Sequence, residues 1–349
     1  MSEAKAYPAF SEILAEIERP AGISEVAVKQ AFDAILAGAW SAEKIAGFLI
    51  ALRLTGESAT TIQSAAHAMR DAMRRVPHSF SAVLDTCGTG GDGLNTVNIS
   101  TGAAIIASAC GVVVAKHGNR AASSRCGAAD VLGALGVPID LEPQGSSQLL
   151  AGCQIAFLLA PVHHPAMRFA GPVRKELGVR TIFNCLGPLA NPAGATHQLI
   201  GAYDDRIRPL MAQALARLGT ERAWVVRGAD GLDEVSPTGA TRVTELSKGE
   251  LREFEVTPED FGLPRIPLSA IGGGDAAENA AVIQAVLSGA EHPSLPAFLL
   301  NAAAALVVAL SLEPRAATAL CIEAIRSGRA REKLEQWRIQ ANNIRAKQA

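Results

Sequence analysis

The chain is poor in aromatic side chains, which make up 4% of its 349 residues although 49% of the residues are hydrophobic. Its core must therefore be built mainly from Ala, Leu, Val and Ile, a composition typical of parallel sheets covered by helices. At this length the chain can form one large domain or two ordinary ones. We therefore expect a protein of the α/β class with ample apolar core.

Charge of one sign, paired cysteines and long apolar runs are also scarce. The formal net charge is −2, which does not indicate a surface for polyanions. The six cysteines are scattered, which argues against a disulfide framework and a zinc site. The N-terminus has no basic-then-apolar signal segment, and the longest apolar run, 297–312, is interrupted by Asn301 and Ser311. We expect a buried helix there and, by default, a cytoplasmic protein.

Serine residues open three helical segments within the first seventy-odd residues. Ser24, Ser41 and Ser58 each stand where they can cap a helix, and apolar residues recur at helical spacing after each of them. The connections between these segments are short, which predicts an antiparallel helical unit. Pro77 marks its expected boundary.

After Pro77 short apolar strands alternate with helices. We expect strands at 82–84, 112–115, 154–159 and 223–226, and helices at 101–110, 128–135 and 209–218. This alternation predicts a mainly parallel sheet. Residues 241–257 are expected to form a hairpin or an edge meander, and 315–347 two amphipathic helices separated at Gly328.

A glycine-rich loop, DTCGTGGDGLNTVNIST at 85–101, joins the first strand to a helix of small residues. This shape brings backbone N–H groups and a helix N-terminus together, which favours a phosphate. The loop fits the dinucleotide fingerprint G-x-G-x-x-G, but Asp92 would repel a bare pyrophosphate, and Lys116 and its neighbours stand where that fold places an acid. The loop also lacks the lysine of NTPase loops. A turn without a ligand is the poorer explanation, because four glycines in six residues cost backbone entropy and no structural need for all of them is evident.

Polar side chains follow the glycines at once, and some of them are expected to cap the next helix. They are Asn95, Thr96, Asn98, Ser100 and Thr101. Five amide or hydroxyl groups in seven residues exceed what one cap needs, so they also suit phosphate oxygens and sugar hydroxyls.

A basic segment, KHGNRAASSR at 116–125, follows the second strand, at the sheet edge where open parallel sheets bind ligands. Three cations and two hydroxyls beside a glycine turn would neutralise a polyphosphate. Alone, the segment would be better explained as a solvated basic loop. Its place beside the glycine loop favours the phosphate site.

An acidic segment, DGLDE at 230–234, follows the fourth strand. Adjacent carboxylates can hold Mg²⁺, which prefers oxygen ligands and often reaches phosphates. Alone, an acidic surface loop would be the better explanation; a pyrophosphate site in the same chain favours the metal. Asp275 and Glu278, by contrast, are best explained as a helix-capping pair.

Two further features stay open at this level. His163 and His164 have no third ligand at a zinc spacing, so lining a pocket or capping a strand end is favoured for them. Arg174 could grip a carboxylate with two hydrogen bonds, or lie on a helix surface among other charges.

In this order, the segments GTGGD, KHGNR and DGLDE together resemble the anthranilate phosphoribosyltransferase family. The resemblance covers nearly the whole chain and includes AGFLIALR at 46–53, TIFN at 181–184 and LGPLANP at 186–192. Each segment alone is a weak signal, whereas the combination is highly specific.

The resemblance implies a fold and a reaction. The fold would combine a small all-helical domain, 1–76 with a returning segment near 168–192, and an α/β domain, 77–349, with a mainly parallel central sheet, as in nucleoside phosphorylases and phosphoribosyltransferases. The enzyme would be a Mg²⁺-dependent pentosyltransferase and a homodimer, with no nucleic-acid or membrane partner. It would join the phosphoribosyl group of phosphoribosyl pyrophosphate to the amine of anthranilate, releasing pyrophosphate, in tryptophan biosynthesis.

The resemblance also implies roles for individual residues. Phosphoribosyl pyrophosphate would contact Gly88, Gly91, Asp92, Thr96, Asn98, Ile99, Ser100, Thr101, Lys116, His117, Gly118, Asn119, Arg120, Ala121, Ala122, Ser123, Ser124 and Ala128. Anthranilate would contact Gly88, Asn119 and Arg174, and Mg²⁺ would be bound by Ser100, Asp233 and Glu234. Lys116 and Arg174 would be catalytic, Lys116 at the leaving pyrophosphate and Arg174 by orienting the anthranilate carboxylate.

Two positions depart from the family pattern. Ala128 stands where many members have a serine that contacts the phosphoribosyl substrate, and Cys126 also stands where serine is common. We expect weaker substrate binding at most, and the same reaction.

Two other functions compete with this one. Pyrimidine nucleoside phosphorylases share the implied fold and handle ribose and phosphate, but the acidic and basic segments favour pyrophosphate with a metal. A relative of this fold that binds nucleic acid should have a basic stripe and a high pI, and the net charge of −2 argues against it.

Overall fold

The computed structural model describes residues 7–121 and 125–348. Its α-helices are α1 (Phe10–Ile17), α2 (Glu25–Leu36), α3 (Ala42–Thr55), α4 (Ala59–Ala72), α5 (Ile99–Ala109), α6 (Ala128–Ala134), α7 (Pro143–Cys153), α8 (Ala160–His163), α9 (Gly171–Leu177), α10 (Phe183–Leu189), α11 (Ile207–Arg217), α12 (Ala276–Leu287), α13 (Leu295–Leu310), α14 (Pro314–Arg326) and α15 (Arg329–Gln348). Its strands are β1 (Leu84–Asp85), β2 (Val114–Gly118), β3 (Ile155–Leu159), β4 (His197–Gly201), β5 (Arg222–Gly228), β6 (Thr241–Ser247) and β7 (Glu250–Val256).

The strands form one seven-stranded sheet in the order β3-β2-β1-β4-β5-β6-β7. The five strands from β3 to β5 are parallel, and β6 and β7 continue the sheet as an antiparallel hairpin. The predicted mainly parallel sheet and the hairpin are therefore confirmed. The strand predictions missed β4, whose sequence begins with His197 and Gln198. Gln198 is buried, and its amide donates to the carbonyl of Pro188 at 2.6 Å, a partner that local sequence does not reveal.

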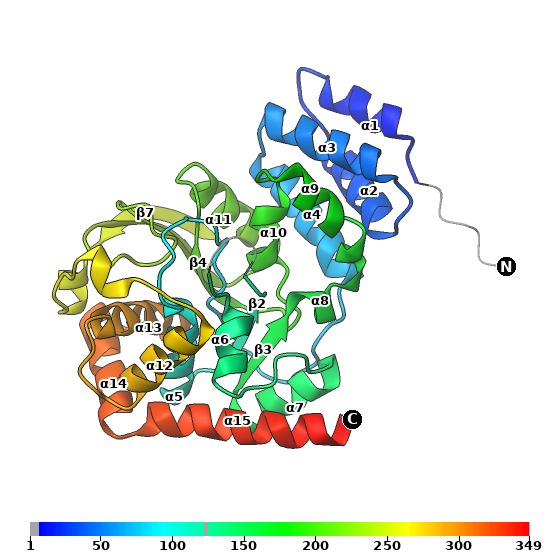
Figure 1. The fold of residues 1–349 in the computed structure, drawn as a ribbon. Coiled ribbons are helices and arrows are strands. Elements are labelled where there is room, and N and C mark those ends of the chain that lie inside the picture. Colours follow the sequence, from blue (N-terminus) through cyan, green and yellow to red (C-terminus); the bar gives the residue numbers. More distant parts are fainter. Residues whose placement is uncertain (1–6, 122–124, 349) are drawn as a thin grey trace.

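Two apolar cores lie on opposite faces of this sheet. In β5, Trp224 and Val226 belong to one core, whereas Ala223 and Val225 belong to the other, as the alternation of a strand requires. The first core is covered by α5, α6, α7 and α12 to α15. The second is shared by α11 and the N-terminal helices, which stand together at one end of the molecule (Figure 1).

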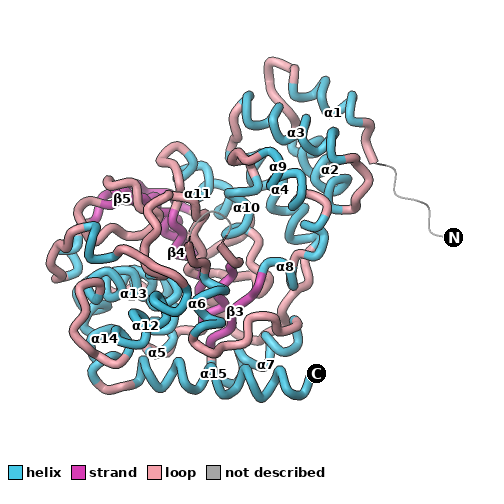
Figure 2. Tube along the Cα trace, in the orientation of Figure 1, coloured by secondary structure: helices cyan, strands magenta, loops and turns pink. Residues whose placement is uncertain are grey.

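The helical part is built from two segments of the chain that are far apart in the sequence. α9 packs against α3, and α10 packs against α4, so these two later helices lie beside the N-terminal ones (Figure 2). Ser24 and Ser58 accept hydrogen bonds from the first turns of α2 and α4, as expected. Ser41 occupies the N-cap position of α3, but its side chain makes no capping bond to the helix.

The C-terminal third is helical. α13 is buried along most of its length, as predicted for the apolar run, and α14 and α15 are the two helices expected around Gly328. Asp275 accepts from two N–H groups at the start of α12, which confirms the capping pair. Within the described residues, no single helix is long and apolar enough to cross a membrane. Among the described helices, the pair α13 and α14 taken together reaches that length and composition, and the two are bent by 117°.

Candidate active site

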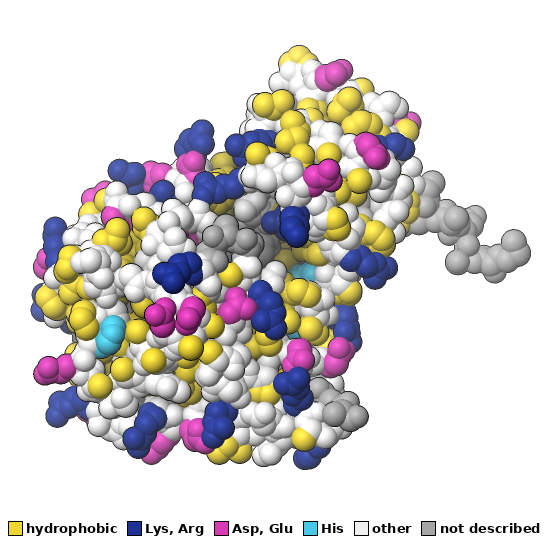
Figure 3. Space-filling view, in the orientation of Figure 1, with side chains coloured by type: hydrophobic (Ala, Val, Ile, Leu, Met, Phe, Trp, Pro, Cys, Tyr) yellow, Lys and Arg dark blue, Asp and Glu magenta, His cyan; other side chains and the backbone are white. Residues whose placement is uncertain are grey.

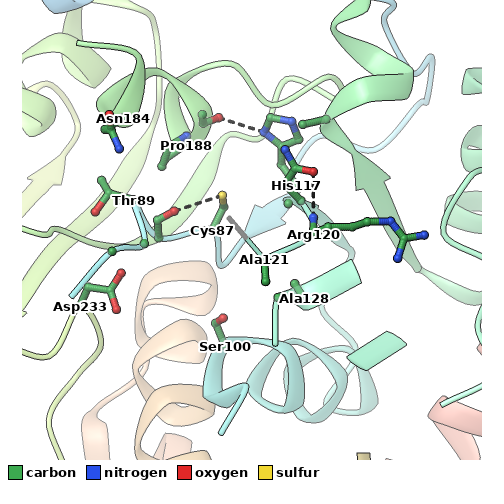
Figure 4. Close-up of a pocket in the computed structure, with 18 of the residues that line it drawn as sticks. Cys87, Thr89, Ser100, His117, Arg120, Ala121, Ala128, Asn184, Pro188 and Asp233 are labelled. Atoms are coloured by element: carbon green, nitrogen blue, oxygen red, sulfur yellow. Dashed lines mark hydrogen bonds between the residues drawn. The ribbon is translucent and has the colours of Figure 1, made fainter. Parts of the chain in front are cut away.

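A pocket of about 730 Å³ lies where the carboxyl ends of the parallel strands meet the helical part. It is lined by the described residues that the sequence nominated, apart from Thr101, which is buried within α5. Ala122, Ser123 and Ser124 lie outside the described residues. Figure 4 shows side chains from the glycine loop, β2, α5 and α10 around this shared space.

The glycine loop is fixed at one end to the neighbouring strand. The N–H and the hydroxyl of Thr89 both donate to the carbonyl of Gly201, at 2.8 and 3.1 Å. Its hydroxyl also accepts from the N–H of Tyr203 at 2.9 Å. Thr89 was not among the predicted site residues, because its role is to hold the loop and its partners come from β4, which the sequence did not reveal.

Backbone geometry explains the glycines better than the sequence did. Gly90, Gly91 and Gly93 have φ of +67°, +82° and +80°, a region that side chains disfavour. A Cβ on Gly88 would lie 3.4 Å from both the carboxylate of Asp233 and the carbonyl of Gly201. The backbone conformation therefore accounts for three of the four glycines, whereas a side chain at Gly88 would meet its neighbours only at about contact distance, so a structural need for all four is still not evident.

Helix α5 begins at Ile99, two residues earlier than predicted, with its N-terminus at the pocket. Asn98 is its N-cap residue but makes no capping bond. Instead, its Nδ2 donates to the carbonyl of Cys126 at 3.2 Å, and its Oδ1 accepts from Asn279 at 2.9 Å. The expected cap is thus replaced by a tie that joins α5 to α12 and to the backbone of Cys126.

Three carboxylates meet beside this helix N-terminus. Burial, together with the nearby Asp92, raises the pKa of Asp233 to about 7. Burial likewise raises the pKa of Glu234 to about 8, against the opposing effects of Lys116 and of the N–H of Ser100. Asp92 accepts from the N–H of Leu94 through Oδ1, while its buried Oδ2 has no donor among the described residues. Such a cluster is stabilised by a cation.

The donor set suits a hard divalent ion. The groups that converge are carboxylate and hydroxyl oxygens, which Mg²⁺ prefers. Within the described residues, no group of three or more His, Cys, Asp or Glu side chains is arranged to hold a metal alone. Mg²⁺ usually binds through one or two protein carboxylates plus substrate phosphates and water, and the adjacent Asp233 and Glu234 both line the pocket.

The acidic loop reaches the pocket because β4 ends in a glycine. β4 lies between β1 and β5 in the sheet, so the loop after β5 must cross β4 to meet the loop after β1. The carbonyl of Asp233 lies where a Cβ on Gly201 would be only 1.5 Å away. The crossing therefore requires glycine at position 201.

The remainder of the acidic segment is structural. Asp230 accepts hydrogen bonds from the hydroxyls of Ser236 and Thr238, at 2.6 and 2.8 Å, and does not line the pocket. Asn301 of α13 accepts from the N–H of Val235 and donates to its carbonyl, both at 2.9 Å. A lone amide inside an apolar run was the sequence signal for this anchor.

Lys116 is a buried residue of β2, which extends to Gly118, beyond the predicted end of the strand. Its Nζ donates to the carbonyl and the hydroxyl of Thr86, at 2.9 and 3.2 Å. Its charge lowers the pKa of Asp85, which burial nevertheless raises to about 6. The lysine thus supports the first residues of the glycine loop and supplies positive charge under the pocket.

His117 and His164 line the pocket as neutral rings 5.1 Å apart. Burial lowers the pKa of His117 to about 3 and that of His164 to about 4. Nδ1 of His117 donates to the carbonyl of Gly187 at 2.9 Å, which leaves Nε2 as an acceptor with no partner among the described residues. His163 turns away and pairs with the carbonyl of Arg74. Of the adjacent residues His163 and His164, His164 alone is among the described residues that line the pocket.

Arg174 enters the pocket from α9. Its guanidinium lies 5.2 Å from the ring centre of Phe183, and burial lowers its pKa. No carboxylate of the described residues lies within ion-pair distance of it. Arg174, a half-buried cation packed against an aromatic ring, is therefore available to bind the carboxylate of a ligand. Of the two alternatives left open for Arg174, this position favours the grip on a carboxylate.

The basic loop is shaped by an acid that the sequence did not single out. Asp130 accepts from the N–H groups of Ala121 and Gly127, at 2.9 and 3.0 Å. It also pairs with Arg120 at 3.0 Å. Asn119 is exposed at the start of this loop, and its side chain accepts from the N–H of Arg120 at 2.8 Å.

Two family models match the chain. A glycosyl transferase family, α/β domain, matches residues 81–331, and a glycosyl transferase family, helical bundle domain, matches residues 11–73. The anthranilate phosphoribosyltransferase of Moorella thermoacetica is 49% identical over 314 residues, 90% of this chain and 93% of that protein. The enzyme so named from Bradyrhizobium diazoefficiens is 48% identical over 327 residues, 93% and 97% of the two chains.

Solved structures agree with these relatives. Anthranilate phosphoribosyltransferase from Thermus thermophilus matches with a TM-score of 0.88 at 43% identity, over 95% of this chain and 98% of that one. The Saccharomyces cerevisiae protein of that name, in complex with phosphoribosyl pyrophosphate and Mg, matches with a TM-score of 0.88 at 31% identity, over 96% and 99%. The expected fold class, a small helical domain with a larger α/β domain, is confirmed by these matches.

Proposed function

Because the chain belongs to the anthranilate phosphoribosyltransferase family, we propose that it transfers the phosphoribosyl group of phosphoribosyl pyrophosphate to the amine of anthranilate, a step of tryptophan biosynthesis. One observation carries the assignment to this pocket. A glycine loop, an uncapped helix N-terminus and two adjacent carboxylates converge on one side of it, while Arg174 stands in it with no carboxylate of the described residues at ion-pair distance. The loop, the helix N-terminus and the two carboxylates together suit a pyrophosphate with a cation, whereas Arg174 suits a carboxylate.

The two substrates are proposed to occupy opposite parts of the pocket. Phosphoribosyl pyrophosphate would lie along the glycine loop, the start of α5 and the 116–128 segment. Anthranilate would lie between Asn119 and Arg174, with Gly88 close to both substrates. Mg²⁺ would be held by Ser100, Asp233 and Glu234, where it would supply positive charge to phosphate oxygens.

Catalysis in this arrangement is electrostatic. The amine of anthranilate is aromatic and already neutral at pH 7, so no strong general base is needed. Breaking the bond to pyrophosphate builds negative charge on the leaving group, which Lys116 and the N–H groups at the start of α5 would stabilise. Arg174 would orient the carboxylate so that the amine faces the anomeric carbon. Neutral His117 adds no positive charge beside the developing cation on the ribose.

The direct test uses the fluorescence of anthranilate. Mixing the pure protein with anthranilate, phosphoribosyl pyrophosphate and Mg²⁺ should give a time-dependent loss of that fluorescence. Omitting phosphoribosyl pyrophosphate, or chelating Mg²⁺, should abolish the loss. A constant signal in the complete mixture, from protein that melts cooperatively, would refute the proposal.

A nucleoside phosphorylase remains the nearest alternative by fold. It would use free phosphate, which needs neither the acidic pair nor a cation. Incubation of the same protein with uridine or thymidine and phosphate should give no free base. Release of base, without consumption of anthranilate, would favour phosphorolysis over phosphoribosyl transfer.

We further propose the assembly and the domain division that the family resemblance implies. Val26 and Leu54 are 66% and 81% exposed on α2 and α3, and Figure 3 shows apolar side chains over much of the visible helical part. These side chains support a homodimer formed through the helical part, to be tested by the mass in solution. The helical domain would comprise 1–76 and 168–192, and the α/β domain the remainder up to 349. A cytoplasmic location stays a prediction.

A further inference from the structure

We propose that Arg180 is a positioning residue that fixes the glycine loop for phosphoribosyl pyrophosphate and ties it to the segment that carries Arg174. This inference rests on the proposed function, since it assigns Arg180 to the binding of one of the two substrates. Neither the sequence motifs nor the substrate contacts proposed above include Arg180. It lies between α9 and α10, on the edge of the helical part.

Three contacts define the position of Arg180. Its Nη2 donates to the carbonyl of Gly91 in the glycine loop. Its guanidinium carbon lies 4.6 Å from the ring centre of Tyr203, which follows β4. Its own carbonyl accepts from Nη1 of Arg53, near the end of α3, at 2.5 Å. The backbone of Arg180 is thus anchored in the helical part, while its side chain reaches the α/β part.

The contact falls between two fixed points of the loop. Thr89 is held by β4, and the side chain of Asp92 closes a turn onto the N–H of Leu94. Between them, Gly90 and Gly91 both have positive φ and, as glycines, have the largest backbone freedom to lose. Hydrogen bonds to a charged donor are the stronger kind, so the guanidinium reduces this freedom before the substrate arrives.

The bond also sets the orientation of a peptide group. The carbonyl of Gly91 and the N–H of Asp92 belong to one planar trans peptide and point in opposite directions. With the carbonyl held by Arg180, the N–H of Asp92 points away from Arg180. Gly91 and Asp92 both line the pocket, so the bond selects one orientation of a donor at the phosphate site. A pre-ordered loop binds its ligand at a lower entropic cost.

The decisive experiment compares Arg180→Ala with wild type in steady-state kinetics of the full chain. We expect the KM for phosphoribosyl pyrophosphate to rise about tenfold, the size of one lost charge-assisted hydrogen bond. The KM for anthranilate should change less than about twofold and the melting temperature by less than about 2 °C. Arg180→Lys, which keeps one donor and the charge, should restore part of the loss.

Arg206→Ala is the matched control, because Arg206 is an exposed arginine near Tyr203 whose side chain pairs with Asp204 alone among the described residues. Arg53→Ala should raise the KM for phosphoribosyl pyrophosphate by a smaller factor. The variant that carries both Arg53→Ala and Arg180→Ala should resemble Arg180→Ala, because Arg53 acts on the glycine loop through Arg180. An unchanged KM for phosphoribosyl pyrophosphate in an active Arg180→Ala variant would overturn the inference. Equal losses for both substrates would also overturn it. Lack of transferase activity in the wild type would instead refute the proposed function.

Discussion

The carbonyl oxygen of Asp233 lies against the Cα of Gly201, so close that a Cβ at position 201 would be 1.5 Å from it. This contact lets the acidic loop after β5 cross the end of β4 and reach the glycine loop after β1. The proposed metal ligands and the proposed phosphate loop therefore meet because one strand ends in a residue without a side chain.

Gly201→Ala should displace the acidic loop and weaken Mg²⁺ use. We expect at least a tenfold loss of kcat/KM and a higher Mg²⁺ concentration for half-maximal rate, because a backbone clash of this kind costs roughly 1–3 kcal/mol or more. Activity assays with Mg²⁺ titration would measure both. Gly133→Ala, at a helical glycine with open space around it, should stay active. Wild-type Mg²⁺ dependence in Gly201→Ala would show that the crossing tolerates a side chain.

Replacing both Asp233 and Glu234 by Ala should abolish Mg²⁺ dependence together with most activity. Two of the three proposed metal ligands would be lost, and with them the charge that holds a cation near the leaving pyrophosphate. The measurement is the initial rate over a range of Mg²⁺ concentrations. Glu250→Ala, an exposed acid at the turn of the β6–β7 hairpin, serves as control. Mg²⁺-stimulated turnover retained in the double variant contradicts the metal assignment.

Arg174→Ala should raise mainly the KM for anthranilate. The guanidinium beside Phe183 would no longer be present to take the carboxylate, and losing such a pair costs about tenfold or more in affinity. Steady-state kinetics with each substrate varied in turn would show the effect. Lys175→Ala removes the next cation of the same helix, which does not line the pocket, and should leave both KM values unchanged. If Arg174→Ala also leaves both KM values unchanged, Arg174 is not an anthranilate ligand.

Protons and Mg²⁺ should compete for the acidic pair. The pKa values of Asp233 and Glu234 lie at about 7 and about 8, above their ordinary values near 4, mainly because of burial. The native state therefore holds protons that the unfolded chain releases. In a metal chelator, stability should be highest at low pH within this window and fall as pH rises from about 4 to 8.

Two measurements test this fall of stability with rising pH. Thermal melts in chelator should show a melting temperature lower by roughly 2–5 °C at pH 8.5 than at pH 6 from these two groups. The Mg²⁺ concentration for half-maximal rate should fall over the same interval, since deprotonated carboxylates bind the ion. The Asp233→Ala, Glu234→Ala double variant should lose most of the pH trend in the melts. A trend of equal size in that variant would assign it to other groups.

Ala128→Ser should strengthen binding of phosphoribosyl pyrophosphate. Ala128 opens α6 and lines the pocket, at the position where the family resemblance leads us to expect a serine, so a hydroxyl there could donate to the substrate. One added hydrogen bond is worth about 1 kcal/mol, or roughly a threefold to tenfold lower KM. Ala134→Ser at the other end of α6 is the matched control. An unchanged or higher KM in Ala128→Ser would mean that the backbone already fills this role.

The sequence by itself determined the local structure and the chemistry of the segments. Helical spacing behind Ser24 and Ser58, the alternation of strands with helices, and the glycine, basic and acidic segments all depend on residues close together in the chain. Local interactions decide such features, which is why they can be predicted from pattern. The same patterns indicated a phosphate ligand and, in combination, the family.

Tertiary structure alone decided how these segments meet. β4 escaped prediction because the buried Gln198 donates its hydrogen bond to the distant carbonyl of Pro188, and Lys116 proved to be a buried support because Thr86 accepts its hydrogen bonds. The return of α9 and α10 to the N-terminal helices, and the tie of Arg180 to Gly91, join residues far apart in the chain. Such contacts depend on strand order and on which faces are buried, and no local pattern encodes either.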